Sequence, residues 1–282
     1  MIAAEELGER AFAADLARAP AIIAARGLGL GAPLVVTEET ASTNDDAKRG
    51  ARHGSPHGAT WLAESQTAGR GRQGRVWISP RGDNLLFSVL LRLGCPPARV
   101  PPLSLVCGLA VRDAVAKALG PAHDADVVVK WPNDVLVRGK KVAGILVESA
   151  LSGAKVEYVI AGIGINVLGR SLPDELSAVA TSIALEGGAD LDRAVVLADV
   201  LAGLERDVAL AAERGLGLVH ARLSKHDALA GRAVESTDSP LRGTGCGIDL
   251  EGRLLVRTAD GTVTKVTAGE LRLRPVTAAR EG

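Results

Sequence analysis

Residues 65–81 (SQTAGRGRQGRVWISPR) have the composition best suited in this chain to holding a negatively charged group. The segment contains four arginines and three glycines but no aspartate or glutamate. Glycine lets backbone N–H groups come close to a ligand, and arginine forms bidentate, charge-assisted hydrogen bonds with carboxylates and phosphates. We therefore predict a loop that closes over an anion. A solvated basic loop and a nucleic-acid-binding patch are the alternatives for such a run.

Two features favour the anion-binding loop. Trp77 follows its last glycine and offers a flat face on which a base can stack, and apolar strands are predicted on either side, at residues 60–63 and 84–93. Other phosphate-binding loops do not match, since no Gly-Lys-Ser/Thr follows. The spacing of Gly69, Gly71 and Gly74 fits a dinucleotide-binding loop only formally, because the next residues, VWISP, cannot begin a long helix.

A second group of charged residues lies in a predicted strand and hairpin. The apolar stretches are residues 127–131, 135–137 and 142–148, with the turn RGKK between the last two. Lys130 and Asp134 lie at strand ends and Lys141 follows the turn, so two ammonium groups and a carboxylate are expected near one edge or face of a sheet. The alternative is an ordinary surface hairpin with solvated lysines.

Two further segments could approach a ligand. The predicted strand at residues 157–167 (EYVIAGIGINV) contains glycines that allow a backbone or ligand to come close, and Asn166 lies near its end. Residues 40–46 (TASTNDD) lie between a predicted strand at residues 34–38 and a helix that runs to about residue 53. Their side chains suit a helix N-cap or a small polar ligand, and the pattern alone leaves both open.

The remaining elements form the scaffold. Helices are predicted within residues 1–31 and at residues 103–119, 177–185, 191–214 and 218–229. In the helix at 103–119, Arg112, Asp113 and Lys117 are expected on the face away from the core. From Gly231 onward, short alternating strands separated by glycine turns predict a small antiparallel barrel.

Composition excludes several classes of protein. The chain has 282 residues, a hydrophobic fraction of 47% and a formal net charge of +0, which describes an ordinary globular protein and argues against a general nucleic-acid binder. Cys95, Cys107 and Cys246 form no metal or disulfide pattern, which fits a reducing cytoplasm. No apolar run is long enough to span a membrane, and the acidic N-terminus does not resemble a signal peptide.

Several segments, in this order, resemble the biotin protein ligase family, also called biotin–[acetyl-CoA-carboxylase] ligases. They are STN at 42–44, ESQTAGRGRQGRVW at 64–77, KWPNDVLVRGKKVAGILVE at 130–148 and GIGINV at 162–167. Residues 247–274 resemble the small C-terminal barrel of that family. The resemblance implies an α+β fold: a mixed β-sheet flanked by helices, the biotin/lipoate ligase-like catalytic domain, at residues 1–230, then a small SH3-like β-barrel at residues 231–282.

The activity that the resemblance implies has two steps and uses ATP, biotin and Mg²⁺. The biotin carboxylate attacks the α-phosphate of ATP to give biotinyl-5′-AMP and pyrophosphate, and a lysine of a biotin carboxyl carrier domain then takes the acyl group. The residues agree with this chemistry. Two anions that repel each other must be brought together, so catalysis should rest on positioning and electrostatic screening.

The resemblance also assigns roles to individual residues. The biotin-binding residues are Ser42, Thr43, Asn44, Gln66, Gly69, Arg70, Gly71, Arg72, Lys141 and Gly144. The ATP- and adenylate-binding residues are Arg75, Trp77, Lys130, Asn133, Asp134 and Asn166. Lys141 and Arg72 are the predicted catalytic cations, Trp77 is expected over the adenine, and Arg75 and Asp134 are expected near the triphosphate or Mg²⁺, whose ligands stay unassigned.

Some members of the family carry an N-terminal DNA-binding module and repress transcription. Only about 33 residues precede the first predicted strand here, so we expect a ligase that binds neither DNA nor membranes. Two alternatives stay open. A lipoate–protein ligase or octanoyltransferase shares the implied fold, although the arginine-rich loop and KWPND favour biotin. A non-catalytic sensor of biotin or nucleotide is the alternative of another class, but Arg70, Arg72 and Lys141 are all present.

Overall fold

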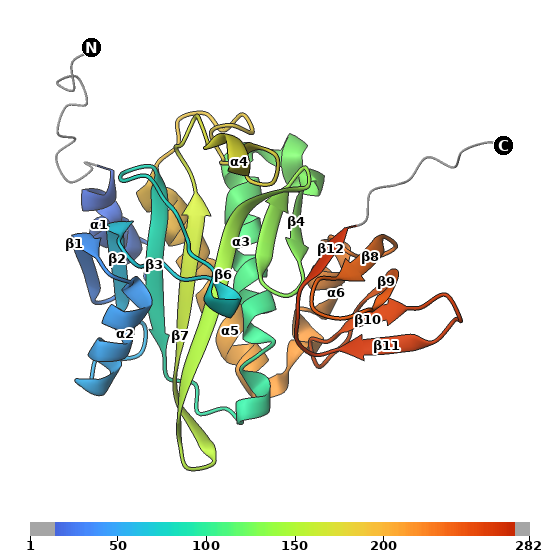
Figure 1. Cartoon of the computed structure of the whole chain (residues 1–282). Coiled ribbons are helices and arrows are strands. Elements are labelled where there is room, and N and C mark those ends of the chain that lie inside the picture. The colour runs from blue at the N-terminus through green and yellow to red at the C-terminus, as the bar shows by residue number, and fades with distance from the viewer. Residues whose placement is uncertain (1–14, 274–282) are drawn as a thin grey trace.

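The computed structural model of the chain describes residues 15–273 and contains two β-sheets, the larger of which is packed against helices (Figure 1). The larger sheet has seven strands in the order β1-β2-β3-β7-β6-β5-β4. Their bounds are β1 Leu34–Thr40, β2 Thr60–Gln66, β3 Asn84–Leu91, β4 Val127–Lys130, β5 Asp134–Val137, β6 Lys140–Ser152 and β7 Lys155–Asn166. Because β1 and β2 are parallel and the other neighbours antiparallel, the sheet is mixed, as the sequence predicts.

Helices cover the two faces of this sheet unequally. The long helices α3 (Leu103–Leu119) and α5 (Arg193–Arg214) lie behind it in Figure 1, together with α1 (Ala19–Ala25), and form the main core. Alternate residues of a strand point to opposite faces. On β3, Phe87 and Val89 join the main core, whereas Leu90 packs with the short helix α2 (Thr43–Arg52) in a separate apolar cluster. The α2 side therefore leaves much of the sheet open for a site.

The helix predicted at residues 103–119 is confirmed, but the prediction that Arg112 faces away from the core is wrong. Arg112 is buried, and its Nε donates to the Val127 carbonyl at 3.0 Å. Its guanidinium also contacts Asp124, in the 3-10 helix η4 (Pro121–Asp126). Because α3 lies between the sheet and α5, hardly any of its surface reaches solvent. Only at its last turn does Lys117 extend outward, to Asp199.

A second prediction, a helix at residues 177–185, is also wrong. Helix α4 covers only Asp174–Ser177, and the chain then pairs with the larger sheet. The Lys141 N–H donates to the Val179 carbonyl at 2.8 Å, and the Thr181 N–H donates to the Lys141 carbonyl at 2.8 Å. Tertiary hydrogen bonds thus override the weak helix preference of this segment.

The helix predicted at residues 218–229 is shorter than expected for the same reason. It divides into the 3-10 helix η5 (Leu216–Leu218) and α6 (His220–Lys225), after which Ala228 pairs with Val129 of β4. Of the helices expected within residues 1–31, only η1 (Leu16–Arg18) and α1 fall inside the described residues. The other short 3-10 helices are η2 (Arg72–Gly74) and η3 (Pro97–Arg99).

The predicted C-terminal β-domain is a five-stranded antiparallel sheet in the order β11-β10-β9-β8-β12. The bounds are β8 Ala233–Ser236, β9 Arg242–Ile248, β10 Leu254–Arg257, β11 Val263–Val266 and β12 Leu271–Leu273. Its buried residues join the main apolar core, and Trp131 Nε1 donates to the Gly252 carbonyl at 3.0 Å. The boundary after residue 230 stays a prediction. Among residues 15–273, no helix is both long and apolar enough to cross a membrane.

Candidate active site

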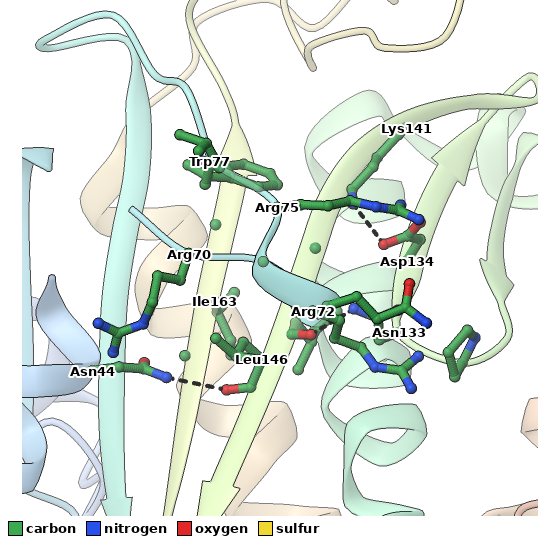
Figure 2. A pocket seen from close by; sticks show the side chains of 18 of the residues that line it. Asn44, Arg70, Arg72, Arg75, Trp77, Asn133, Asp134, Lys141, Leu146 and Ile163 are labelled. Carbon is green, nitrogen blue, oxygen red and sulfur yellow. Dashed lines mark hydrogen bonds and ion pairs between the residues drawn. The ribbon is translucent and has the colours of Figure 1, made fainter. Parts of the chain in front are cut away.

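A cavity opens on the α2 side of the larger sheet, where the arginine-rich loop crosses the strands (Figure 2). Every predicted biotin- or nucleotide-binding residue lines it except Gly69 and Asn166. The lining residues that were predicted are Ser42, Thr43, Asn44, Gln66, Arg70, Gly71, Arg72, Arg75, Trp77, Lys130, Asn133, Asp134, Lys141 and Gly144. Segments far apart in the sequence thus meet at one place, as the predicted chemistry requires.

The floor of the cavity is made of glycines on the two central strands. Gly144 of β6 pairs with Gly164 of β7, and Gly162 lies two residues earlier on the same face. A Cβ on Gly164 would lie 2.7 Å from the Trp77 indole, and one on Gly162 would overlap the Asn44 amide. These glycines therefore let two predicted ligand-binding side chains lie directly on the sheet.

One end of the cavity consists of Ser42, Thr43, Asn44 and Gln66, and we call it the amide end. Ser42 is the N-cap residue of α2, but its side chain makes no capping hydrogen bond. Instead Gln66 Oε1 accepts from the backbone N–H of Thr43 at 2.8 Å and from its hydroxyl at 3.1 Å. The cap of α2 is therefore supplied by a side chain from β2 and not by Ser42, and the assignment of this polar cluster to a ligand stays a prediction.

Asn44 is fixed at the amide end by groups that the sequence did not single out. Its Oδ1 accepts from the buried Ser88 hydroxyl at 2.5 Å, and its Nδ2 donates to Glu148 Oε2 at 2.7 Å. Glu148 also accepts from Lys48 at 2.6 Å. The orientation of the Asn44 amide, and so the positions of its donor and acceptor, is set by this network.

Arg70 lies beside the amide end rather than among the other cations of the loop (Figure 2). Its guanidinium forms a bidentate pair with Asp45, at 2.7 and 2.6 Å. That hydrogen-bonded pair is the main cause of a pKa of Asp45 below the usual range. The predicted contact of Arg70 with the biotin carboxylate would require it to exchange this partner.

The opposite end holds Arg72, Arg75, Lys130 and Lys141, and we call it the cationic end. Two carboxylates, Asp134 and Glu270, line the cavity with them. Such an excess of positive charge in one hollow attracts an anion of two or more charges. Burial lowers the pKa of Lys130, and repulsion from Lys141 and Arg75 lowers it further against the attraction of Asp134.

Lys141 is the most firmly placed cation of the cationic end. Its backbone is hydrogen-bonded on both sides by residues 179–181, the segment that replaces the predicted helix. Its ammonium lies 2.7 Å from Asp134 Oδ1 and 5.5 Å from the centre of the Trp77 ring (Figure 2). The predicted catalytic lysine, the predicted adenine-stacking tryptophan and the predicted triphosphate-side aspartate thus lie together.

The arginine-rich loop also touches the C-terminal sheet. Arg75 Nη1 donates to Glu270 Oε1 at 2.8 Å, and Gln73 Nε2 donates to Asp238 Oδ2 at 3.1 Å. Arg72 directly precedes Gln73 in the loop, and burial is the main cause of a pKa of Arg72 below the usual value. The cationic end is therefore closed in part by residues from the second sheet.

The remaining predicted residues have structural contacts of their own. Asn133 Nδ2 donates to the Ile145 carbonyl at 2.8 Å, which leaves its side chain at the cavity wall. Asn166 Nδ2 donates to the Thr181 carbonyl at 2.9 Å, outside the lining. The Gly69 carbonyl accepts from the Trp77 N–H at 2.9 Å, so this glycine shapes the loop. Their assignments to ligands stay predictions.

Comparison with known proteins places the chain in a family. Residues 36–166 match the model of the Biotin/lipoate A/B protein ligase family. The chain is 35% identical over 250 residues to the bifunctional ligase/repressor BirA of Bacillus spizizenii, covering 86% of this chain and 75% of that protein. The chain belongs to the biotin/lipoate A/B protein ligase family.

Further relatives of this family are similar in sequence or in fold. The biotin–[acetyl-CoA-carboxylase] ligase of Mycobacterium tuberculosis is 40% identical over 174 residues, covering 61% of this chain and 62% of that protein. A biotin protein ligase from Aquifex aeolicus, solved with biotin and ATP, superposes with a TM-score of 0.69 at 32% identity, over 86% of this chain and 98% of that one. The resemblance found in the sequence motifs and the fold class are confirmed.

Sequence reasoning missed several residues of this family site. Ser88, Glu148 and Glu270 hold or line the cavity, yet none was assigned a role. The glycines of the predicted strand at residues 157–167 were expected to let a backbone or ligand come close, and Gly162 and Gly164 line the cavity. No signal in the sequence pointed to Glu270, which directly precedes β12 of the other sheet.

Proposed function

We propose that this chain is an ATP-dependent biotin–protein ligase, which forms biotinyl-5′-AMP and transfers the biotinyl group to a lysine of a biotin carboxyl carrier domain. The observation that supports it best is a single cavity with two unlike ends. The amide end offers oriented donors and acceptors for a neutral ureido ring, and the cationic end offers positive charge for a carboxylate and phosphates. A neighbouring structure from the same family holds biotin and ATP.

In the first step, an oxygen of the biotin carboxylate attacks the α-phosphorus and pyrophosphate leaves. Lys141 and Arg72 would lie against the two reacting anions and reduce their repulsion, and Arg75 and Lys130 would hold the departing phosphates. No group of the protein needs to form a bond to the substrate. The contribution of the chain is positioning and charge in a cavity shielded from water.

In the second step, the neutral amine of the carrier lysine attacks the acyl carbon, the bond between that carbon and the phosphate oxygen breaks as AMP leaves, and the nitrogen releases one proton to solvent. The same cations favour this step. An ammonium that approaches a positively charged site loses its proton more readily than it does in water. The arginine-rich loop has to stay closed until the carrier arrives, because the mixed anhydride is open to hydrolysis.

Mg²⁺ would enter with ATP. Within residues 15–273, no group of three or more His, Cys, Asp or Glu side chains could bind a metal by itself. Asp134 and Glu270 line the cationic end and can each supply one carboxylate, which suits a cation that keeps waters and phosphate oxygens in its shell. The ion would offset part of the charge of the phosphates.

The two alternatives are weaker on specific grounds. A lipoate ligase or octanoyltransferase has no ureido ring to hold, so the oriented Asn44 amide and the Gln66–Thr43 pair would have no ligand. A non-catalytic sensor has no need of four cations facing one cavity. A cytoplasmic location, the carrier as partner and the absence of DNA and membrane binding stay predictions.

The deciding experiment is ATP–pyrophosphate exchange by the purified chain with biotin, with lipoate, with octanoate and with no acid. We expect exchange with biotin alone. Exchange with lipoate or octanoate would assign the chain to the alternative ligase class, and no exchange with any acid would favour a binding protein. A carrier domain added with biotin and ATP then tests the transfer step.

A further inference from the structure

Arg193, the first residue of α5, is a charged residue that the proposed chemistry does not use and that no solvent reaches. Its side chain is 0% exposed. A guanidinium keeps its proton in proteins, so its burial is costly unless every donor finds a partner. The groups that accept hydrogen bonds from this buried arginine therefore indicate its role.

The carboxylate partners of Arg193 come from two distant segments. Its Nη1 donates to Glu64 Oε2 at 2.7 Å and its Nη2 to Glu64 Oε1 at 3.1 Å. Its Nε and Nη2 donate to the two oxygens of Asp15, each at 3.0 Å. Burial alone would lower the pKa of Arg193, but the hydrogen bonds that it donates to Asp15 and Glu64 raise it above its usual value.

The same guanidinium holds both ends of the arginine-rich loop. Glu64 lies in β2, just before the loop, and Asn84 begins β3, just after it. Besides its contact with Glu64, Nη1 donates to the Asn84 carbonyl at 3.1 Å. The ladder between β2 and β3 runs only from the pair Thr60–Val89 to the pair Ala63–Leu86. Arg193 thus joins the two strands beyond the point where their register ends.

The contacts continue from both strand ends into the site. Gln66, two residues after Glu64, accepts the two hydrogen bonds of Thr43 at the amide end. On the other side, Asn84 Nδ2 donates to the Ser79 hydroxyl within the loop at 2.8 Å. A shift of the β2 end would therefore move the amide end of the cavity, and a shift of the β3 end would move the last part of the loop.

Helix packing alone does not require this arrangement. An apolar side chain of similar volume often replaces a buried ion pair with no loss of stability. What a guanidinium adds is a planar set of donors with fixed directions, which can hold two strand ends at one separation. We propose that Arg193 is a positioning residue that sets the spacing of the loop ends, and thereby how well the loop retains biotinyl-AMP.

This inference rests on the proposed ligase function, and its test follows the fate of the adenylate. Enzyme carrying labelled biotinyl-AMP is mixed with a carrier domain, and the fraction released to solution is compared with the fraction transferred. For Arg193→Met we expect about three- to tenfold more release, with adenylate formation within about threefold of wild type, because a small misplacement of a closing segment weakens retention.

Arg112→Met is the matched control. Arg112 is also a buried arginine bound to carboxylates and a carbonyl, but it lies in α3 and contacts η4 rather than the loop. Both variants should lower the melting temperature, whereas only Arg193→Met should increase release. Equal increases in the two variants would overturn the inference, since general destabilisation would then explain the leak. Wild-type release from Arg193→Met would overturn it as well.

If Arg193→Met does not fold, Glu64→Gln gives the answer. This change keeps the shape of the side chain and the bonds between Arg193 and Asp15, but weakens the link to the loop. More release supports the inference and unchanged release overturns it. Failure of the proposed function has a different signature, because wild-type protein would then show no biotin-dependent pyrophosphate exchange.

Discussion

At the amide end of the cavity the side chains are already held by hydrogen bonds, whereas the cationic end brings several positive charges close together. At the amide end, hydrogen bonds to Ser88 and Glu148 fix the orientation of the Asn44 amide. At the cationic end, burial is the main cause of a lowered pKa of Lys130, and repulsion from Lys141 and Arg75 lowers it further. A neutral ring needs hydrogen-bonding groups that are already oriented, while two anions need an excess of positive charge around them. The amide end should therefore control affinity and the cationic end the rate.

Lys141→Ala is the substitution with the largest expected effect on rate, and it tests whether the cationic end controls the rate. Biotin binding should stay measurable, while adenylate formation should fall by about two to three decades, the usual loss for one electrostatic stabiliser. Pyrophosphate exchange at saturating biotin measures this. Lys140→Ala is the control, because the neighbouring Lys140 points to the Ser177 carbonyl at 2.9 Å, outside the cavity lining. Near-normal exchange in Lys141→Ala would remove this lysine from the catalytic role.

Arg72→Gly should reduce the retention of biotinyl-AMP more than it reduces the formation of biotinyl-AMP. Without the guanidinium the loop closes poorly, and we expect labelling of lysines on unrelated proteins to rise by about 10- to 100-fold. A biotin blot of a mixture of carrier and bystander proteins reports it. Arg81→Gly, which alters an exposed arginine of the same loop paired with Glu38, should not leak. Labelling confined to the carrier in Arg72→Gly would contradict the role of the loop.

Asn44→Ala tests the other half of the comparison. Removal of the amide should weaken biotin binding about tenfold, the effect of about 1.4 kcal/mol, and should leave exchange at saturating biotin within about threefold of wild type. Calorimetric titration with biotin gives the affinity. Ser88→Ala, which keeps the Asn44 amide and removes the hydroxyl that contacts Asn44 and Thr43, should have the smaller effect. A variant with normal affinity but a slow reaction would show that the two ends do not divide the work as described.

The smallest effect is expected for Lys130→Met, which should stabilise the protein and weaken ATP binding. Because the pKa of Lys130 is lower in the folded state than in the unfolded chain, its charge costs stability below that pKa, and the cost disappears as the pH rises through it. We expect a melting temperature about 2–4 °C higher at neutral pH. Thermal melts across alkaline pH check the sign: wild type should gain stability relative to the variant. A variant less stable at neutral pH would refute the account.

Much of the fold was predictable, and the failures share one physical cause. The strands and the helix at residues 103–119 follow from alternation and from 3.6-residue apolar spacing. Residues 177–185 have similar local signals but give their hydrogen bonds to Lys141 and to the end of β7. Arg112 likewise occupies a polar position of its helix, yet η4 covers it. Contacts between distant segments decided these cases, and periodicity carries no information about them.

Site residues with a recognisable role in a sequence motif were predicted, whereas residues that reach the site through the packing of distant elements were not. Motif residues such as Asn44 and Lys141 line the cavity as expected. Glu148 ends a recognised motif, but its bonds to Asn44 and Lys48 depend on how α2 crosses the sheet. Glu270 faces Arg75 only because the second sheet packs beside the loop. A single sequence shows the type of a side chain, and the packing of elements decides what it meets.

The glycine floor sets a limit on any attempt to make this site accept another acid. Libraries of engineered variants usually enlarge or shrink the side chains beneath a substrate, but Gly144, Gly162 and Gly164 have none to shrink and no room to grow. The depth of the cavity is a property of the main chain, shared by every variant. New substrate preferences would have to be sought in the roof and walls, at α2 and along residues 70–77.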